Sequence, residues 1–374
     1  MRIGVPKEIK DNEFRVGLTP SSVAELVHHG HQIIVETGAG LGSGLTDGEY
    51  EAAGAELAAG PEAIFQMAEM IVKVKEPLAP ERARLGKGQV LFTYLHLAAD
   101  LEQTRDLLAS GVTCIAYETV TAPGGGLPLL TPMSEVAGRL APQVGAHCLE
   151  REAGGRGVLL GGVPGVPPAD VIILGGGVAG THAATIALGM GANVTVVDRN
   201  PEALRRLAFH FGTGVRTIFS TQSAIAEIVK RADLLIGTVL VPGAAAPKLI
   251  SRAMLATMKQ GAVIVDVCID QGGCCETSRP TTHSNPIYIV DGIVHYCVTN
   301  MPGAVARTST FALNNATLPF VLALADKGWK TALAQDPHLR AGLNIHAGLL
   351  TCQPVAEAHG MTWDAAETVL GIAA

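Results

Sequence analysis

Three glycines spaced as in a dinucleotide-binding turn carry the clearest chemical signal in the sequence. Gly175, Gly177 and Gly180 form a G-x-G-x-x-G pattern directly after the apolar run Val171–Leu174. The first glycine permits a tight turn, the second lets the backbone approach a pyrophosphate, and the third lets the next helix lie close to the strand. A diphosphate would then lie at the helix N-terminus, where free N–H groups and the helix dipole favour an anion. The pattern therefore predicts a dinucleotide cofactor.

An acidic residue narrows the choice of cofactor. Asp198 ends a second apolar run about 20 residues after the glycine turn, where a carboxylate can accept hydrogen bonds from ribose hydroxyls. A carboxylate there repels a 2′-phosphate, so NAD is favoured over NADP, although the neighbouring Arg199 leaves NADP open. Bound FAD is the other alternative, but a motif in the middle of the chain favours a dehydrogenase with a separate substrate domain.

The ends of the predicted strands nominate further residues, because open α/β sheets bind ligands beyond the carboxyl ends of their strands. The predicted strands of the nucleotide domain are Val171–Leu174, Val194–Val197, Val215–Phe219, Leu234–Thr238, Ala262–Val267 and Ile293–Val298. The residues that follow them are Ser220, Val239, Leu240, Cys268, Ile269, Asp270, Thr299, Asn300 and Met301. Six strands with intervening helices indicate a doubly wound domain.

Three basic residues nearer the N-terminus could handle a substrate. Lys75 and His96 each follow an apolar run, and Arg15 lies in an early loop. A lysine offers a point charge, histidine suits acid–base work near neutral pH, and arginine can bind a carboxylate through two parallel hydrogen bonds. Each residue taken singly could equally have a structural or surface role. Together with Asp270 they favour a small anionic substrate with a carbonyl or amine at the reacting carbon.

The elements that position these residues alternate between strand and helix, which predicts a parallel sheet. Strands are expected at Arg2–Val5, Gln32–Val35, Met70–Val74, Val90–Leu95 and Thr113–Tyr117, and helices at Pro20–His29, capped by Thr19, and after the capping box Thr46-x-x-Glu49. A Gly/Pro-rich break at residues 122–132 precedes a predicted helix at Ser134–Glu152. A second such loop, Gly154–Ala169, leads into the glycine turn.

The residues after 302 look almost wholly helical and offer no strands for a sheet of their own. We therefore expect them to pack on the first domain and make it discontinuous. The sequence thus predicts an α/β fold with two Rossmann-like domains. A doubly wound dinucleotide-binding domain at 129–304 would be inserted in a substrate domain formed by 1–128 and 305–374.

Composition excludes several classes of protein. A net charge of −7 and an aromatic content of 4% argue against nucleic acid as a partner, which needs a basic face and stacking platforms. No apolar run approaches the roughly 18 residues of a membrane helix, and the charged start MRIGVPKEIKD is unlike a secretory signal, so a soluble cytoplasmic protein without membrane partners is expected. The seven cysteines show no ligand spacing, so reduced apolar cysteines and no metal site are expected.

Many segments, in order, resemble the alanine dehydrogenase and transhydrogenase alpha-subunit family. They are MRIGVPKEIKDNEFRVGLTP, VKVKEPL, YLHLAAD, LPLLTPMSEVAGR, GGGVAG, DQGGCCETSRPTTHSNP and YCVTNMPGAVARTST, followed by NATLPF and VAEAHGM. Because they are spread across most of the chain, the resemblance is very specific. It implies an alanine dehydrogenase, which deaminates L-alanine oxidatively and reversibly to pyruvate and ammonium with NAD, and it implies a homohexamer.

The resemblance also implies roles for individual residues. Arg15 and Lys75 would bind the substrate, and His96 and Asp270 would be the acid–base pair. The implied cofactor contacts are Ser134, Gly175, Gly177, Val178, Ala179, Gly180, Asp198, Ser220, Val239, Leu240, Val267, Cys268, Ile269, Asp270, Arg279, Val298, Thr299, Asn300 and Met301.

The chain departs from the family pattern in the helix after Asp198, where Ala203 stands in place of a basic residue, with Arg205 and Arg206 just beyond. The role of that position is therefore in doubt, and cofactor affinity could be weaker. Alternatives to the alanine dehydrogenase are a transhydrogenase alpha-subunit-like NAD-binding protein, a lysine-forming saccharopine-type dehydrogenase with a larger substrate pocket, and a non-catalytic NAD sensor. The segments HLAAD and NMPGAVARTST favour the dehydrogenase, and a pure sensor has no use for the whole substrate set.

Overall fold

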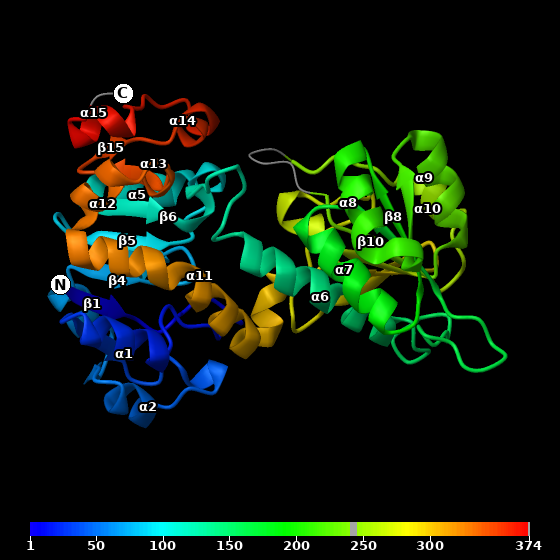
Figure 1. The fold of residues 1–374 in the computed structure, drawn as a ribbon, viewed down its shortest axis with the longest axis horizontal. Coiled ribbons are helices and arrows are strands. Elements are labelled where there is room, and N and C mark those ends of the chain that lie inside the picture. Colours follow the sequence, from blue (N-terminus) through cyan, green and yellow to red (C-terminus); the bar gives the residue numbers. More distant parts are fainter. Residues whose placement is uncertain (240–244, 373–374) are drawn as a thin grey trace. The chain divides into compact units, whose positions relative to one another are not determined.

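The computed structural model describes residues 1–239 and 245–372, which form two compact units (Figure 1). Unit 1 consists of Met1–Met133 and Val305–Ala374, and unit 2 of Ser134–Ala304. The two units divide inside helix α6 (Thr131–Cys148), whereas the sequence-based division at 128/129 lies just before that helix. The chain therefore leaves unit 1 once and returns to it at residue 305.

Unit 1 is built on an eight-stranded sheet of order β15-β14-β6-β5-β4-β1-β2-β3. The strands are β1 (Arg2–Val5), β2 (Gln32–Glu36), β3 (Glu56–Ala58), β4 (Met70–Val72), β5 (Val90–Thr93), β6 (Thr113–Ala116), β14 (Leu343–His346) and β15 (Leu349–Leu350). The first six strands pair in parallel, in the order of a doubly wound sheet, and β14 and β15 pair antiparallel.

The helices of unit 1 come from both ends of the chain. They are α1 (Pro20–His28), α2 (Asp47–Ala52), α3 (Pro61–Met67), α4 (Ala79–Arg82), α5 (Leu101–Ser110), α11 (Ala306–Lys327), α12 (Trp329–Gln335), α13 (Pro337–Arg340), α14 (Gln353–His359) and α15 (Ala366–Leu370). The predicted cap of α1 is confirmed, because the Thr19 side chain accepts from the Ser22 N–H, and so is the Thr46/Glu49 capping box. The long helix α11 packs on α1, where Asn314 accepts from the Thr19 N–H and the Ser22 hydroxyl.

The expectation that the C-terminal segment has no strands is wrong. β14 pairs with β6, and Ile345 and Leu350 lie in the same buried cluster as Leu91 and Ile34 of the N-terminal segment. The hairpin between β14 and β15 turns through Ala347 and Gly348, both with positive φ, and so lacks the Asn-Gly signal that marks such turns in a sequence. The expectation that this segment returns to the first domain is confirmed.

Unit 2 holds a seven-stranded sheet of order β12-β13-β11-β10-β7-β8-β9. The strands are β7 (Asp170–Leu174), β8 (Asn193–Asp198), β9 (Val215–Phe219), β10 (Leu234–Gly237), β11 (Val263–Asp266), β12 (Ile287–Val290) and β13 (Ile293–Tyr296), and the helices besides α6 are α7 (Val178–Gly189), α8 (Pro201–Phe211), α9 (Gln222–Ile228) and α10 (Arg252–Leu255). The order reverses at β7, which pairs with β8 on one side and β10 on the other. The predicted doubly wound sheet is thus confirmed.

Besides β14 and β15, sequence reasoning missed the short strands β3 and β12 and misplaced one helix. β12 is an antiparallel edge strand: its sequence, IYIV, is apolar, but its side chains are only partly buried. β3 is only three residues long. The helix expected at Ser134–Glu152 is α6, which starts and ends earlier, at Thr131 and Cys148. Among the described residues, no helix is both long and apolar enough to cross a membrane.

Candidate active site

The glycine turn of unit 2 has the strand–turn–helix geometry that its sequence predicts. β7 ends at Leu174, Gly175 has a φ of +106°, and Gly177 precedes the first residue of α7. A Cβ on Gly180 would lie 1.8 Å from the Gly175 carbonyl oxygen, so only glycine lets the helix pack this closely on the turn. A Cβ on Gly177, in contrast, would meet nothing within 4 Å. The open side of Gly177 fits a pyrophosphate at the N-terminus of α7.

Asp198, the last residue of β8, also holds the turn in place. Its Oδ2 accepts from the Gly176 N–H at 2.5 Å, and its Oδ1 accepts from the Asn200 N–H at 2.7 Å. The carboxylate is half-buried beside the turn and can still accept from a ribose. The negative charge of Asp198 disfavours a 2′-phosphate on that ribose, and so disfavours NADP.

The helix after Asp198 explains part of the departure at Ala203. Ala203 is buried in α8, where a short apolar side chain fits the core-facing side of the helix. Arg206, one turn further on, donates from Nη2 to the Gly176 carbonyl at 3.4 Å. Arg205 instead forms an exposed ion pair with Glu202. Arg206 therefore brings a positive charge to the glycine turn.

The other predicted cofactor residues of unit 2 lie mostly at the carboxyl ends of its strands. Ser220 follows β9, Val239 follows β10, and Val267–Asp270 form a 3₁₀ turn directly after β11. The segment Val298–Asn300 follows β13, with Met301 at the start of the next 3₁₀ turn, and Ser134 lies in the first turn of α6. Leu240 lies outside the described residues.

Two of these residues contact each other, and one lies apart. The Asp270 carboxylate accepts from the Asn300 N–H at 3.4 Å, so the turns after β11 and β13 meet. Asn300 has a φ of +55°, which an asparagine tolerates better than most residues. Arg279 does not follow a strand: its guanidinium lies over the Tyr288 ring, 4.2 Å from the centroid.

The fold assembles a cysteine–aspartate cluster that the sequence spacing did not predict. The ligand atoms of Asp266, Cys268 and Cys274 lie within 4.8 Å of one another, and all three residues are buried. Hydrogen bonds account for this arrangement, since the Asp266 carboxylate accepts from the N–H groups of Cys268 and Cys274 and from the Ser278 hydroxyl. Asp266 thus shapes the turn that carries Asp270.

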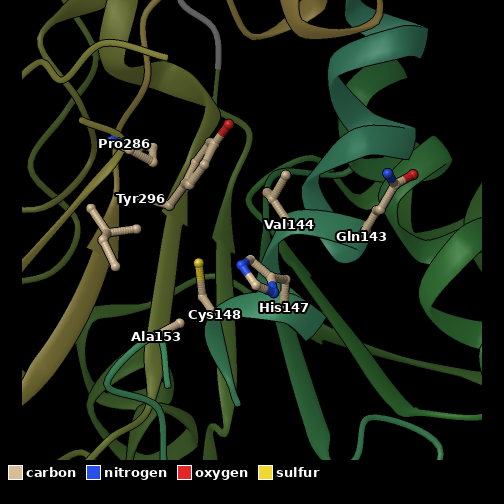
Figure 2. A pocket seen from close by; sticks show the side chains of 8 residues that line it. Gln143, Val144, His147, Cys148, Ala153, Pro286 and Tyr296 are labelled. Carbon is tan, nitrogen blue, oxygen red and sulfur yellow. The ribbon is translucent and has the colours of Figure 1, made fainter. Parts of the chain in front are cut away.

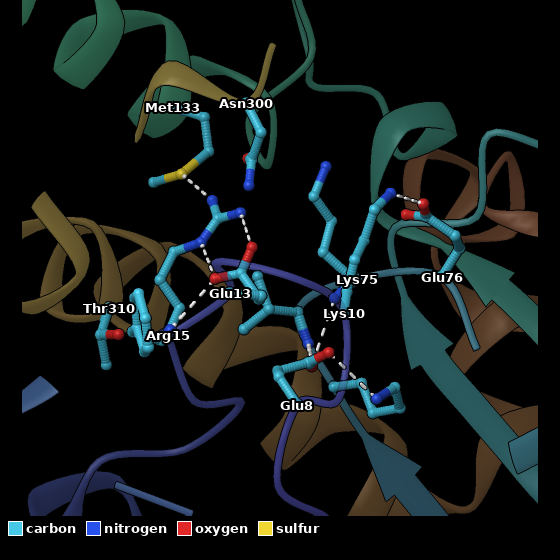
Figure 3. A network of polar contacts seen from close by, with 12 residues as sticks. Glu8, Lys10, Glu13, Arg15, Lys75, Glu76, Met133, Asn300 and Thr310 are labelled. Carbon is cyan, nitrogen blue, oxygen red and sulfur yellow. Dashed lines mark hydrogen bonds and ion pairs between the residues drawn. The ribbon is translucent and has the colours of Figure 1, made fainter. Parts of the chain in front are cut away.

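Arg15 in unit 1 is a buried cation rather than a surface charge. Its Nε and Nη2 donate to the two carboxylate oxygens of Glu13 at 2.7 and 2.5 Å, and its Nη1 lies 3.1 Å from the Met133 sulfur (Figure 3). Burial lowers the pKa of Arg15, but the hydrogen bond and charge of Glu13 outweigh it, so the pKa lies above its ordinary value. The guanidinium plane is therefore fixed before any ligand arrives.

Lys75 follows β4, and its backbone is held by a buried cluster of charges formed by Glu8, Lys73 and Glu81. The Glu8 carboxylate accepts from the N–H groups of Val74 and Lys75 at 2.7 and 3.3 Å. Glu8 also pairs with Lys73, which is fully buried and pairs in addition with Glu81. Burial raises the pKa of Glu8, against the lowering effect of Lys73. Lys73 is thus a buried structural ion close to the backbone of the predicted substrate lysine.

His96 follows β5 in a left-handed backbone conformation, with a φ of +52°. Glu118 holds this conformation: its carboxylate accepts from the His96 N–H at 2.6 Å and from the Leu95 N–H at 3.2 Å, and lies 4.0 Å from His96 Nδ1. The His96 ring stacks on Tyr94, with centroids 5.8 Å apart. Because β4 and β5 are parallel neighbours, Lys75 and His96 leave the sheet at the same edge.

Sequence reasoning missed Glu13, Glu118 and Tyr94. The strand-end rule could have found Glu118, which follows β6 as Lys75 and His96 follow β4 and β5. Glu13 and Tyr94 carry no such signal, because their roles depend on the side chains that they contact.

Replacing Glu118 with alanine is expected to lower the free energy of unfolding by about 1–3 kcal/mol, because the N–H groups of Leu95 and His96 lose their acceptor. Glu118→Gln keeps an acceptor oxygen and is expected to retain most of that stability. Urea unfolding of both variants measures the difference. Equal losses in the two variants would show that the negative charge, rather than the hydrogen bonds, holds the turn.

Two pockets of the described residues, one in each unit, lie away from these residues. In unit 2 a pocket of about 260 Å³ lies between the end of α6 and the edge strands of the sheet, lined by Val144, His147, Cys148, Pro286 and Tyr296 among others (Figure 2). Its lining contains none of the predicted cofactor residues. The assignment of the site therefore rests on the strand ends and not on this hollow.

Comparisons with known proteins extend over nearly the whole chain. The model described as "Alanine dehydrogenase/PNT, N-terminal domain" matches residues 4–137, and "Alanine dehydrogenase/PNT, C-terminal domain" matches residues 141–353. An alanine dehydrogenase of Halomonas elongata is 61% identical over 371 residues, which are 99% of this chain and 100% of that protein. The solved structure of an L-alanine dehydrogenase has a TM-score of 0.94 at 54% identity, covering 96% of this chain and 99% of that one. A transhydrogenase from Sinorhizobium meliloti is more distant, with a TM-score of 0.80 at 28% identity and coverages of 94% and 99%.

Proposed function

The chain belongs to the alanine dehydrogenase/PNT family, and on that premise we propose that it is an NAD-dependent L-alanine dehydrogenase. The reaction converts L-alanine, NAD⁺ and water into pyruvate, ammonium, NADH and a proton, and it is reversible. The observation that carries the proposal is the 61% identity to an alanine dehydrogenase along 99% of the chain. The lower identity to a transhydrogenase, 28%, makes a transhydrogenase-like role the weaker candidate.

Unit 2 is proposed to hold NAD. The pyrophosphate would lie at the turn of Gly175, Gly177 and Gly180, because the backbone is open at Gly177, and Asp198 would bind the adenosine ribose. When bound, the nicotinamide supplies the hydride acceptor. The further proposed contacts are Ser134, Val178, Ala179, Ser220, Val239, Leu240, Val267, Cys268, Ile269, Asp270, Arg279, Val298, Thr299, Asn300 and Met301.

Unit 1 is proposed to hold the substrate. Arg15 would bind the alanine carboxylate, with Glu13 keeping the guanidinium in one orientation so that little freedom is lost on binding. Lys75 would bind the carboxylate or the carbonyl oxygen of pyruvate as a point charge. The buried Glu8 carboxylate fixes the backbone from which Lys75 extends.

His96 and Asp270 are proposed to exchange protons with the substrate and with water. The imidazole can take a proton from the water that replaces the amine and return it to the leaving ammonia. Asp270, aligned by the Asn300 N–H, would orient the amine or the water. Glu118 supports the orientation of His96 from its Nδ1 side.

We further propose that the enzyme is a cytoplasmic homohexamer. The oligomeric state rests on the resemblance to the family. The compartment is supported by the cysteines, all seven of which are free thiols, as is usual where the cell keeps thiols reduced.

The proposed function is tested by following NADH oxidation with ammonium and a panel of 2-oxo acids: pyruvate, glyoxylate, 2-oxobutyrate and 2-oxoglutarate. We expect the highest kcat/KM with pyruvate, and far lower activity with NADPH because Asp198 repels a 2′-phosphate. A long or dicarboxylic acid as the best substrate would overturn the alanine assignment. Tight NADH binding without turnover of any acid would favour a non-catalytic NAD-binding role instead.

A further inference from the structure

Two histidines and an aspartate converge at the surface of unit 1, and none of them has a role in the site described above. His29 caps the C-terminus of α1, His31 directly precedes β2, and Asp326 lies in the last turn of α11. His29 Nδ1 lies 3.0 Å from Asp326 Oδ2 and 3.2 Å from Oδ1, and His31 Nε2 lies 2.8 Å from Oδ1. Each imidazole thus directs a nitrogen at the same carboxylate.

We propose that His29, His31 and Asp326 bind a divalent transition-metal ion such as Zn²⁺. Two imidazole nitrogens and a carboxylate oxygen are a donor set that zinc accepts readily, at about 2.0–2.2 Å from the ion. The present contacts are hydrogen bonds of 2.8–3.2 Å. The ion would therefore take the place of the shared protons, with the side chains rotating to close around it.

The cluster is accessible to an ion and to water. The side chains of His29 and Asp326 are 35% and 37% exposed. His31, at 8%, is more buried, and its Nδ1 lies 3.3 Å from the N-terminal ammonium of Met1. An ion could therefore enter from solvent without opening the fold, and water would complete its coordination. The same exposure lets the His29 and Asp326 side chains rotate at little cost in packing.

The end of helix α11 also favours a cation near Asp326. A carboxylate in the last turn of a helix faces the negative end of the helix dipole, which is unfavourable. A divalent ion would neutralise both the carboxylate and the end of α11.

Glu25 supplies a second carboxylate, next to the ring nitrogen of His29 that faces away from Asp326. It precedes His29 by one helical turn, and its Oε1 lies 3.5 Å from His29 Nε2, the nitrogen that faces away from Asp326. Metal-bound histidines usually donate their other N–H to such a carboxylate, which fixes the ring and its tautomer. With the proton of His29 on Nε2 and directed at Glu25, Nδ1 presents its lone pair to the ion.

The test is a titration of the chelator-treated full-length protein with Zn²⁺ by calorimetry. We expect one ion per chain at this site, with a rise in the unfolding temperature because the ion binds only the folded cluster. His29→Ala, His31→Ala and Asp326→Asn should each remove this binding, and Glu25→Gln should weaken it about 10- to 100-fold. The matched control is His28→Ala, because His28 is an exposed neighbour on the same helix without a contact to Asp326 among the described hydrogen bonds.

Unchanged Zn²⁺ binding in His29→Ala and Asp326→Asn would overturn the proposal, as would an equal loss in His28→Ala. Co²⁺ titration provides a second readout. Thiolate-to-cobalt charge-transfer bands would place the ion at Cys268 and Cys274 instead, and nitrogen and oxygen ligation supports the proposed site. Urea unfolding without metal checks that the variants fold; if the less exposed His31→Ala does not, His29→Gln and Asp326→Asn decide the question.

Discussion

Replacing His96 with alanine is expected to lower kcat for pyruvate reduction by about 10²- to 10⁴-fold, the usual contribution of a general acid–base group. The Kd for NADH is expected to stay near the wild-type value, because the proposed cofactor residues all lie in unit 2. Steady-state kinetics and a fluorescence titration with NADH measure the two quantities. His147→Ala is the matched control, since His147 is 71% exposed and outside the proposed site.

The backbone at His96 requires a second variant. Its left-handed conformation, with a φ of +52°, is costlier for alanine than for asparagine. His96→Asn therefore removes the imidazole but keeps the turn. Equal losses of kcat in the alanine and asparagine variants would support acid–base chemistry. Recovery in His96→Asn, or turnover near wild type in both variants, would contradict the assigned role.

Replacing Gly180 with alanine is expected to abolish measurable NADH binding and to destabilise unit 2 by about 1–3 kcal/mol or more. The new Cβ would lie 1.8 Å from the Gly175 carbonyl oxygen, so the turn or helix α7 must move. Urea unfolding and NADH titration report the two effects. Gly189→Ala is the control, because Gly189 ends the same helix and its Cβ would meet nothing within 4 Å.

A third glycine separates folding from binding. A Cβ on Gly177 would also meet nothing within 4 Å, so Gly177→Ala should unfold like the wild type. It should nevertheless weaken NADH binding, because the added carbon occupies the side from which a pyrophosphate would approach. Wild-type affinity in Gly177→Ala would show that the cofactor does not bind against this turn.

The nucleotide-binding half of the site is readable from the sequence because its determinants are local. Gly175, Gly180 and Asp198 lie on adjacent elements of one βαβ unit, and strand ends nominate Ser220 and Asp270 in the same way. The backbone alone brings these positions together. The predicted contacts themselves stay predictions until a ligand is bound.

The proposed substrate site in unit 1 is harder to predict from the sequence, because most of the contacts that shape it join segments far apart in the chain. Lys73 lies in the alternating segment Val72-Lys73-Val74-Lys75, a pattern typical of a strand with one solvent-exposed face. It is nevertheless fully buried and pairs with Glu8 and Glu81. The burial of Arg15 depends on Glu13, two residues before it, and on Met133. Charge patterns in a sequence do not indicate which ions a fold will enclose.

The secondary structure of the C-terminal segment 305–374 is also hard to predict from the sequence. β14 is a four-residue strand with a polar Asn344, so its pattern is too short to distinguish from a loop. Its strand character comes from pairing with β6, more than two hundred positions earlier in the chain. No local propensity encodes such a pairing.

This return of the chain has a consequence for synthesis on the ribosome. β6 is complete long before β14 exists, and it must wait while the whole of unit 2 emerges. At elongation rates of about 5–20 residues per second, the wait lasts on the order of tens of seconds. During that time β6 is an open sheet edge that other nascent chains could pair with. Unit 2 is one continuous segment and can fold first. Unit 1, whose two segments flank unit 2 in the sequence, should therefore complete its folding last.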